Sequence, residues 1–499
     1  MKNKILGIAS SLRNARWGSG NKQLIDSLKS IQNENELFEF LSVESELHLE
    51  NFVKAGRGEG KSFDELYKNL KKNIGDKGLS NSETALSAAL WEAQISGCDI
   101  DHISLSEFFL SSGRFQNKDI LINKIMESDG ILVSGPVYFG DRSSLLQKLI
   151  DFILNDESLR KSLENKVYAG ISVGAKRNGG QETSLVYNLY DFVRFGALGV
   201  GNSSDTTSQY GGTCVAGDIG MAHKDQYGIK TSMGTGKRLA EVVKIYNSDF
   251  ILNSKLDILF LVLQDKDGLA LNICNEIISS FPNESFKVIN VCEEHVLPCI
   301  GCDICPTNID VDEVYRCIVT NKNDCFDELH NKLFDYDAII PVVYSPTNRT
   351  NIKTSYQTFL ERTRYIRRGD YLWSNTVVMP FVIEDIGGQD NYAMRCLTAF
   401  IRHHTIVSAP IVAFNYNNHL IDFKNILDSF NKLIIQTRKI TAGKIVAMQS
   451  DSISYSPVGY ILSADKEAED TKLHLRSETI VKRKERLDQR SIDRNIVER

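Results

Sequence analysis

The feature that most constrains the fold is the alternation of short β-branched runs with longer stretches that carry apolar residues at helical spacing. Lys4–Ser10 has the pattern of a buried strand, and Ser82–Gln94 has apolar residues on one face of a helix. Strands that alternate with helices predict an α/β fold with a doubly wound parallel sheet. The other strands expected in this half are Asp99–Leu105, Asp129–Ser134, Lys166–Val173 and Ala197–Asn202, and the other helices are Ser144–Asn155, Glu182–Phe195 and Gly236–Tyr246.

The second half of the chain repeats this plan. Asp129-Gly130-Ile131-Leu132 resembles Asp337-Ala338-Ile339-Ile340, and Gly179-Gly180-Gln181-Glu182 resembles Gly387-Gly388-Gln389-Asp390. Both pairs are 208 residues apart (129 to 337 and 179 to 387), and this shared spacing favours a duplicated domain. The expected strands are Leu256–Leu263, Phe286–Val291, Asp337–Val343, Thr376–Ile383 and Ile411–Asn415, and the expected helices are Leu269–Ser280, Asp324–Phe334, Thr354–Tyr365, Tyr392–His403 and Phe423–Thr437.

These patterns predict two domains in tandem, over residues 1–250 and 251–447, followed by a charged C-terminal extension over 448–499. A polar segment at about residues 17–78 separates the first strand from its helix, and we expect it to be an insertion that is helical in part over Phe63–Ile74.

The net charge and the lengths of the apolar runs argue against nucleic acid and membranes as partners. The net charge is −6, so the chain has no general electrostatic attraction for nucleic acid or for an anionic membrane. No apolar run approaches the roughly 20 residues that span a bilayer. The N-terminus has no long apolar region or cleavage site of a secretion signal, so we expect a cytoplasmic protein without nucleic-acid or membrane partners.

In open parallel sheets, ligands bind at the carboxyl ends of the strands, so the residues that follow each strand are the candidate site. Ser10, Ser11 and Arg13 follow the first strand, and hydroxyls, free backbone N–H groups and a guanidinium suit a phosphate. The alternative is a solvated turn. A second set of hydroxyls, from Ser80, Ser82 and Thr84, precedes the next helix, with Ser82 as the expected N-cap.

The loop after the third strand contains Pro136, Val137, Tyr138, Phe139 and Gly140. It is suited to present backbone groups to the edge of a flat ring, and the alternative is a tight turn with aromatic residues in the core. The polar loop Thr206–Thr213 shows no strand or helix pattern, and we expect it near the same site.

The loop after the fourth strand contains Gly174, Gly179 and Gly180, which allow close backbone approach to a planar ligand. Lys176 and Arg177 carry charge suited to a reduced, anionic ring or to an anionic substrate. Gln181 ends the same loop. Tyr138, Arg177 and Gln181 are the side chains we expect to tune such a ring, and no side chain stands out as an acid or base.

These loops resemble those of the NADPH-dependent FMN reductase family. The matching stretches are Ser10–Arg13, Ser80–Leu90, Asp129–Asp151 and Val173–Thr183. The resemblance implies two flavodoxin-like domains, FMN bound in the first, and NAD(P)H as the electron donor. In that family the first loop holds the phosphate, and the loops resembling Pro136–Gly140 and Gly179–Gln181 border the ring. Family members form dimers, so the resemblance implies a homodimer or a tandem chain that mimics one.

The cysteines are unevenly placed, because six of the ten lie between Cys292 and Cys325. Cys299, Cys302 and Cys305 form two consecutive CxxC steps, the spacing that an iron–sulfur cluster needs. Cys317 is the leading candidate for the fourth ligand of a [4Fe–4S] cluster, ahead of Cys325 and Cys292. Zinc and unligated reduced thiols are the alternatives. The surrounding residues resemble iron–sulfur flavoproteins of the same superfamily, although the gap before Cys317 is longer.

The second domain departs from the family pattern. Asp265 and Asp267 put carboxylates where a phosphate would sit, and Tyr344–Thr347 replaces the loop that borders the ring. We therefore expect the second domain to bind FMN weakly or not at all. Gly234–Arg238 fails the P-loop pattern and is interpreted as a helix start.

Three hypotheses for function remain at this point. The first is an NAD(P)H-dependent FMN oxidoreductase that passes electrons, with or without an iron–sulfur cluster, to an unidentified acceptor. The second is an electron-transfer or scaffold partner of another enzyme with no turnover of its own. The third is an interaction protein with an empty flavin site and a zinc-stapled second domain. His403 and His404 are interpreted as a surface pair.

Overall fold

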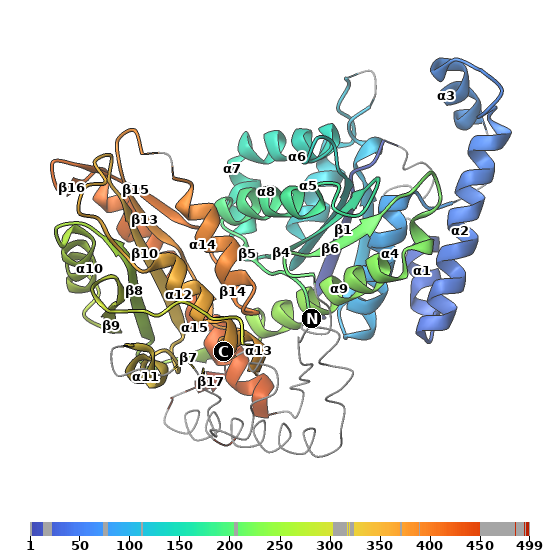
Figure 1. The fold of residues 1–499 in the computed structure, drawn as a ribbon. Helices are drawn as coiled ribbons and strands as arrows, with labels where there is room; N and C mark the ends of the chain where they lie inside the picture. Colours follow the sequence, from blue (N-terminus) through green and yellow to red (C-terminus); the bar gives the residue numbers. More distant parts are fainter. Residues whose placement is uncertain are drawn as a thin grey trace. The chain divides into compact units, whose positions relative to one another are not determined.

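The structure is a computed structural model that divides into two compact units, Met1–Lys244 and Ile245–Arg499 (Figure 1). It describes residues 2–12, 22–72, 78–110, 113–203, 208–302, 317, 319, 324–369, 372–388, 390–449, 485, 494 and 496–498. Among these residues, no helix combines the length and the apolar character that crossing a bilayer requires.

The first unit is built on a parallel sheet whose strands pair in the order β2-β1-β3-β4, with β5 and β6 both beside β4. This is the order of a flavodoxin-type doubly wound sheet, which has its ligand crevice at the carboxyl ends of the strands. The strands are β1 (Lys4–Ala9), β2 (Asp99–Ser104), β3 (Gly130–Pro136), β4 (Val167–Gly174), β5 (Leu198–Gly199) and β6 (Gly212–Val215).

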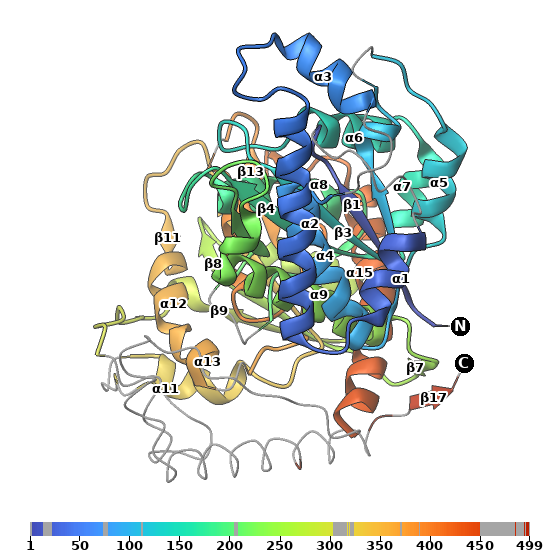
Figure 2. The ribbon, with the colours of Figure 1, turned by 90° about the vertical axis from the view of Figure 1, so that its right-hand side faces the viewer.

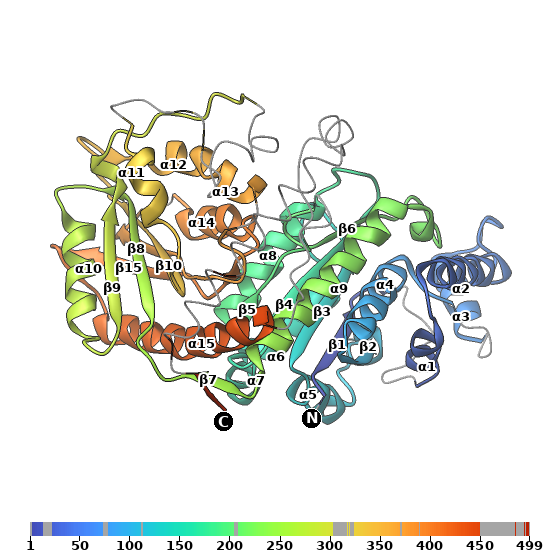
Figure 3. The same ribbon diagram turned by 90° about the horizontal axis from the view of Figure 1, so that it is seen from below.

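Helices cover both faces of this sheet because side chains alternate along each strand. A Cβ on Gly7 of β1 would meet Leu90 of α4, and one on Gly130 of β3 would meet Val243 of α9. A Cβ on Gly170, on the other face of β4, would meet Leu185 of α8 (Figure 3). The helices are α4 (Asn81–Ile95), α5 (Lys118–Met126), α6 (Ser144–Leu154), α7 (Glu157–Leu163), α8 (Gln181–Arg194) and α9 (Gln226–Tyr246), with short 3-10 turns η1 (Leu105–Glu107) and η2 (Ala222–Lys224).

The insertion between β1 and α4 is more helical than the sequence indicated. It forms α1 (Lys22–Ser30), α2 (Glu34–Lys54) and α3 (Phe63–Lys72), of which only the last was expected. Leu37 and Leu41 of α2 are buried, and the hydroxyl oxygens of Ser45 and Thr84 in α4 are 3.0 Å apart. The insertion is therefore packed on the unit through α2 (Figure 2).

The second unit contains a sheet of the same strand order. The strands β9-β8-β10 pair in parallel, β12 and β13 lie beside β10, and β14 and β15 follow. Its strands are β7 (Phe250–Leu252), β8 (Asp257–Asp265), β9 (Ser285–Asn290), β10 (Ala338–Ser345), β11 (Lys353–Thr354), β12 (Val377–Val378), β13 (Phe381–Asp385), β14 (Ile406–Val407), β15 (Ile411–Tyr416), β16 (His419–Leu420) and β17 (Ile496–Glu498).

Aromatic residues fill the core under the long helix of this unit, α15. Phe430 of α15 packs against Phe260 of β8 and Phe381 of β13, with ring centroids 5.8 and 5.6 Å apart. Helices α12 and α14 lie on the opposite face (Figure 3). The helices are α10 (Leu269–Ser279), α11 (Phe326–Leu329), α12 (Tyr356–Arg362), α13 (Arg364–Gly369), α14 (Tyr392–Ile401) and α15 (Phe423–Gln449), with η3 (Val291–Glu293) and η4 (His330–Lys332).

The end of the chain is anchored in this unit. β17 pairs with β7 in antiparallel fashion, and the Arg494 guanidinium binds Asp337 at 2.7 Å and Asp257 at 2.5 Å. Most of the charged extension lies outside the described residues.

Several element boundaries differ from the expectations. The helix expected at Gly236–Tyr246 begins ten residues earlier, so Gly236 lies inside α9 and not at its start. A Cβ there would be 2.0 Å from the carbonyl oxygen of Ala89, so a glycine allows α9 to approach α4 closely. The strand expected at Thr376–Ile383 is split into β12 and β13 around Pro380, because proline has no N–H to donate.

Candidate functional site

The loops after β1 and β3 are joined directly at the carboxyl ends of their strands. The Ser10 N–H donates to the carbonyl oxygen of Ser134 (2.9 Å), and the Ser143 hydroxyl donates to the carbonyl oxygen of Ser10 (2.8 Å). A Cβ on Gly135 would lie 2.1 Å from the Ser10 hydroxyl oxygen, so a larger residue there would displace this hydroxyl. Ser10 and Ser11 are both buried, and Arg13 lies outside the described residues.

The N-terminus of α4 lies beside the same strand ends, because the Ser134 hydroxyl donates to the carbonyl oxygen of Ser82 (2.8 Å). The sequence analysis predicted Ser82 as the N-cap of α4, and this was wrong. The N-cap is Ser80. Ser80 and Glu83 form a capping box, in which the Ser80 hydroxyl accepts from the Glu83 N–H and the Glu83 carboxylate accepts from the Ser80 N–H. The sequence signal was Ser80 followed three residues later by Glu83.

The predicted hydroxyl set is partly engaged within the protein. The Thr84 hydroxyl donates to the carbonyl oxygen of Ser80 at 3.0 Å, and the Ser80 hydroxyl caps the helix. The main attraction for an anion at this place is therefore the N-terminus of α4 itself, where backbone N–H groups and the helix dipole favour negative charge.

A buried acid and a buried base lie side by side behind this helix end. Glu83 Oε1 is 3.9 Å from His102 Nε2, and both side chains are about 1% exposed. Burial raises the pKa of Glu83 to about 7 and lowers the pKa of His102 to about 4. Neither Glu83 Oε1 nor the His102 ring nitrogens have a hydrogen-bond partner among the described residues. The capping carboxylate is thus close to its protonation midpoint at neutral pH.

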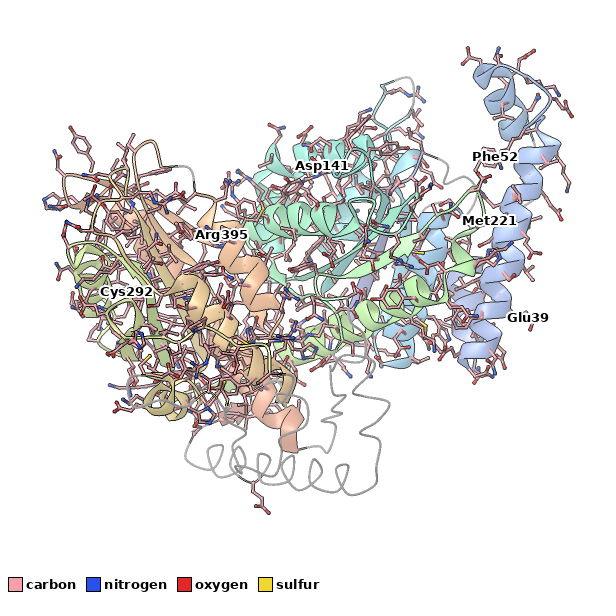
Figure 4. All side chains as sticks on the ribbon, in the orientation of Figure 1. Glu39, Phe52, Asp141, Met221, Cys292 and Arg395 are labelled. Carbon is pink, nitrogen blue, oxygen red and sulfur yellow. The ribbon has the colours of Figure 1, made fainter. Side chains whose placement is uncertain are left out.

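The loop after β3 ends in a tight turn. Tyr138 and Asp141 exchange backbone hydrogen bonds of 2.9 Å, and the two residues between them have positive φ, 53° at Phe139 and 77° at Gly140 (Figure 4 labels Asp141). Positive φ at both central residues defines a type I′ turn, which favours asparagine or glycine and strains phenylalanine. The Phe139 side chain is fully exposed and Tyr138 is half exposed, so the alternative of aromatic residues in the core is wrong.

The loop after β4 is closed by the side chain of Gln181. Its amide oxygen accepts from the Gly179 N–H (2.7 Å), and its amide nitrogen donates to the carbonyl oxygen of Lys176 (2.8 Å). Gly180 has φ 94°, and a Cβ there would lie 2.7 Å from the Cα of Gly140. The loops after β3 and β4 therefore touch at two glycines, which brings the predicted ring-binding segments together.

The Arg177 side chain makes several contacts within the protein. Its guanidinium pairs with Asp225 at 2.5 Å, donates to the carbonyl oxygen of Thr213 (3.2 Å) and lies 4.9 Å from the Tyr227 ring centroid. Arg177 and Gln181 thus shape the loop, whereas the Tyr138 side chain is exposed. Thr213 belongs to β6, a strand that the sequence pattern did not reveal.

Sequence reasoning did not assign a role to Asn81, which anchors another loop at this edge. Its amide nitrogen donates to the carbonyl oxygen of Asp218 (2.7 Å), and its amide oxygen accepts from the N–H groups of Met221 and Ala222 (3.1 Å each) (Figure 4 labels Met221). The available signal was an amide side chain between two serines at a helix start.

In the second unit, a carboxylate occupies the corresponding helix N-terminus. Asp265 ends β8, is 3% exposed, and accepts from the N–H groups of Lys266 (2.7 Å), Ala270 (2.9 Å) and Leu271 (3.3 Å) at the start of α10. Burial raises its pKa above the ordinary value. Asp267 is exposed. The backbone N–H groups at the start of α10 are therefore engaged by the protein's own carboxylate.

The ends of β10, β13 and β15 form a closed polar network in this unit. The Tyr344 hydroxyl donates to Asp385 (2.8 Å), the Asn415 amide donates to the same carboxylate (2.8 Å), and Ser345 donates to Asp390. His403, interpreted from the sequence as a surface residue, is 5% exposed and packs on the Trp373 ring.

The cysteine segment follows β9 in the second unit. Cys299, Cys302 and Cys317 are partly exposed, whereas Cys305 lies outside the described residues. Cys292 is buried and donates to Asn290 Oδ1 at 2.9 Å (Figure 4). Burial raises the pKa of the Cys292 thiol to about 12. Within the described part of the chain, no three metal-binding side chains are grouped closely enough to hold an ion.

Comparisons with known proteins identify one part of the chain. The model of the family described as NADPH-dependent FMN reductase matches residues 75–189, which include the start of α4 and the loops after β3 and β4. An iron–sulfur flavoprotein of Methanocaldococcus jannaschii is 40% identical over 129 residues, which is 26% of this chain and 65% of the relative. The chain therefore spans less than two thirds of that relative's length.

Another iron–sulfur flavoprotein, from Methanosarcina thermophila, is 29% identical over 179 residues, or 33% of this chain and 89% of the relative. Among solved structures, a WrbA-like flavodoxin from Agrobacterium tumefaciens is 12% identical with a TM-score of 0.26, over 49% of this chain and 98% of its own. A flavone reductase has 14% identity and a TM-score of 0.27, over 48% and 63%. Residues 75–189, in the first unit, are thus similar to the family described as NADPH-dependent FMN reductase.

Proposed function

We propose that the protein is an NAD(P)H-dependent FMN oxidoreductase whose first unit binds FMN. The observation that carries this proposal is the family match over residues 75–189. The matched segment contains the N-terminus of α4 and the two loops that meet at Gly140 and Gly180.

The described residues of the first unit fit such a cofactor. The N-terminus of α4 would hold the phosphate through its backbone N–H groups, with Ser10 and Ser11 beside it. A Cβ on Gly140 would meet nothing within 4 Å, so the loop leaves open space at that point. The backbone of Pro136–Gly140 and of Gly174–Gln181 would border the ring, with Tyr138 and Phe139 exposed beside it.

Bound FMN would accept a hydride from the nicotinamide and release electrons singly or in pairs, and an iron–sulfur cluster would accept them one at a time. The protein's contribution is to position the reactants and to exclude water. Arg177 and Gln181 fix the loop after β4. Glu83 lies behind the phosphate position, and the charge of its carboxyl group depends on pH.

We propose that the second unit is a second flavodoxin-like domain that binds an iron–sulfur cluster and no FMN. Its strand order supports the fold, and Asp265 at the start of α10 opposes a phosphate. Cys299, Cys302, Cys305 and Cys317 would be the ligands. The partial exposure of Cys317 favours it over the buried Cys292 as the fourth ligand. The cluster, a homodimer, the cytoplasmic location and the electron acceptor all belong to this proposal.

Anaerobic purification tests it directly. We expect one FMN and about four iron atoms per chain, and oxidation of NADPH or NADH with an artificial acceptor. Flavin without nicotinamide oxidation under any acceptor would support the electron-carrier hypothesis. A colourless protein that contains zinc would contradict the proposal and support an interaction role.

A further inference from the structure

Residues 216–222 form a loop after β6 that joins three parts of the first unit, and we call this loop the strap. It begins beside the loop after β4. The Ala216 N–H donates to the carbonyl oxygen of Gly174 (2.7 Å), and the Gly217 N–H donates to that of Ala175 (3.2 Å). These two hydrogen bonds continue the parallel pairing of β4 with β6 past the end of β6. The strap is therefore attached to the loop that would border the flavin ring.

One side chain fastens the strap to the N-terminus of α4. Asn81 is the first residue of this helix. Its amide nitrogen donates to the carbonyl oxygen of Asp218 at 2.7 Å, and its amide oxygen accepts from the N–H groups of Met221 and Ala222 at 3.1 Å each (Figure 4). A single amide can do this because it carries both donors and an acceptor. The strap thus links the helix end that would hold the phosphate to the loop that would border the ring.

The insertion also holds the strap. Arg57, which follows α2, donates from Nη2 to both carboxylate oxygens of Asp218, at 2.8 and 2.7 Å. Gly220 of the strap has φ 68°, and a Cβ there would lie 2.4 Å from the carbonyl oxygen of Ser45 in α2. Glycine therefore allows the strap backbone to adopt this conformation and to approach α2 closely. The strap is held by α4 through hydrogen bonds and by the insertion through an ion pair and close packing.

We propose that Asn81 and Arg57 are positioning residues for FMN: through the strap they hold the N-terminus of α4 at a fixed separation from the loop after β4. This inference rests on the proposed FMN site in the first unit. The phosphate and the ring of FMN are two linked binding groups, and the second adds its full affinity only if the two sites are correctly spaced. Arg57 and the strap lie outside the family match over residues 75–189, so this device is an addition of this chain to the matched segment.

A second ion pair of the insertion provides a matched control. Lys29 of α1 pairs with Asp99 of β2 at 2.9 Å, and their side chains are 43% and 44% exposed. The side chains of Arg57 and Asp218 are 34% and 57% exposed. Both pairs join the insertion to the rest of the unit, but Asp99 is the first residue of β2 and lies at the amino ends of the parallel strands, opposite the strap. Comparing R57Q with K29Q therefore separates loss of the strap contact from loss of an anchoring ion pair in general.

The experiment uses the full chain without flavin, as wild type, N81A, R57Q and K29Q. The dissociation constants of FMN and of riboflavin, which lacks the phosphate, are measured by fluorescence titration. The ratio of the riboflavin constant to the FMN constant reports how much affinity the phosphate adds. A residue that only stabilises the fold changes both constants together and leaves this ratio unchanged. We expect the ratio to fall about tenfold in N81A, which loses three hydrogen bonds, and about two- to fivefold in R57Q, because exposed ion pairs are weak. K29Q should keep the wild-type ratio.

Hydrogen exchange of the flavin-free protein provides a readout that needs no ligand. In N81A, the amides of Met221 and Ala222 lose their acceptor and should exchange faster than in wild type. If the strap transmits this change to the loop after β4, the amides of Ala216 and Gly217 should exchange faster as well. Amides of β1 and β3 should remain protected, which shows that the sheet is intact.

The outcomes separate this inference from the proposed function. R57Q keeps the inference testable if N81A does not fold, because the Arg57 side chain is partly exposed. A wild-type ratio in both N81A and R57Q, or an equal fall in R57Q and K29Q, overturns the inference while FMN binding by wild type still supports the proposed function. A wild-type protein that binds neither FMN nor riboflavin contradicts the proposed function, and the inference with it.

Discussion

Asp337 makes the same backbone contacts in the second unit that Asp129 makes in the first. Asp129 Oδ2 accepts from the Lys4 N–H at 2.8 Å, and Asp337 Oδ2 accepts from the Asp257 N–H at 2.8 Å. The N–H of each aspartate donates back to the carbonyl oxygen of the same partner, again at 2.8 Å. Asp129 therefore joins the start of β3 to the start of β1, and Asp337 joins the start of β10 to the start of β8. This correspondence supports the proposed duplication.

The turn at Phe139 predicts a conflict between stability and function. Phe139→Gly removes a left-handed phenylalanine, so we expect the first unit to be about 1 kcal/mol more stable while FMN binds more weakly. Calorimetry and FMN titration measure the two effects. Phe139→Ala serves as the control because it removes the ring and keeps most of the strain. Unchanged FMN affinity in both variants would remove Phe139 from the site.

The contact between Gly180 and Gly140 predicts a sharp effect of one methyl group. Gly180→Ala places a Cβ 2.7 Å from the Gly140 Cα, so we expect the loops after β3 and β4 to separate and FMN affinity to fall by at least about tenfold. Gly97→Ala is the matched control, because Gly97 has a similar φ (101° against 94°) with nothing within 4 Å of the added Cβ. Equal FMN affinity in the two variants would show that the loop contact is unimportant.

Glu83 predicts a specific pH dependence. Its pKa in the folded protein is about 7, above the ordinary value of 4.5, so folding retains a proton that the unfolded chain releases. The contribution of Glu83 to stability therefore falls as the pH rises from about 4.5 to 7. We expect Glu83→Gln to gain stability relative to wild type across this range, by up to about 3 kcal/mol. Chemical denaturation at several pH values measures it.

His102 acts in the opposite direction. Its pKa is lowered from 6.5 to about 4, so the unfolded chain binds the extra proton and wild-type stability falls as the pH drops from 6.5 to 4. The pH dependences that Glu83 and His102 give to the free energy of unfolding partly cancel in wild type. The quantity to measure is therefore the difference in free energy of unfolding between Glu83→Gln and wild type. Glu39→Gln, at an exposed position on α2, is the control. A difference that does not change with pH would contradict the assigned pKa.

Asp265 predicts how the second unit responds to phosphate. Asp265→Ser leaves the N–H groups of Lys266, Ala270 and Leu271 without their acceptor, and we expect a loss of about 1–3 kcal/mol. Inorganic phosphate should restore part of it in FMN-saturated protein, as seen in the calorimetric transition of the second unit. Asp267→Asn should change neither. If phosphate stabilises wild type and Asp265→Ser equally, Asp265 does not stand in for a bound anion.

Most of the strands and helices could be predicted from the sequence because their apolar periodicity is strong. β1, β8 and α6 match their expected ranges within one or two residues. The missed elements have no such pattern. β6 is only four residues long, and its burial comes from tertiary contacts with β4 and α9. Local sequence cannot encode a strand whose partners supply most of its stabilisation.

The candidate site was predictable by position and only partly by side-chain role. The loops after β1, β3 and β4 were identified because ligand sites follow parallel strands. What each side chain does depends on contacts that are distant in sequence, as with Arg177 and Asp225 or Asn81 and Met221. Gln181 illustrates the limit, because its amide binds its own loop and the sequence alone does not indicate which partner it selects.

The insertion changes the order in which the first unit can assemble. In an uninterrupted strand–helix pair, the helix docks on its strand almost as soon as both have been synthesised. Here Leu90 of α4 packs over Gly7 of β1 across more than 80 intervening positions, which include α1, α2 and α3. A contact between β1 and α4 that is ordinarily local has therefore become long-range. During synthesis, α4 is available to pack on β1 only after the whole insertion has been made. We expect the first unit to fold slowly for its architecture.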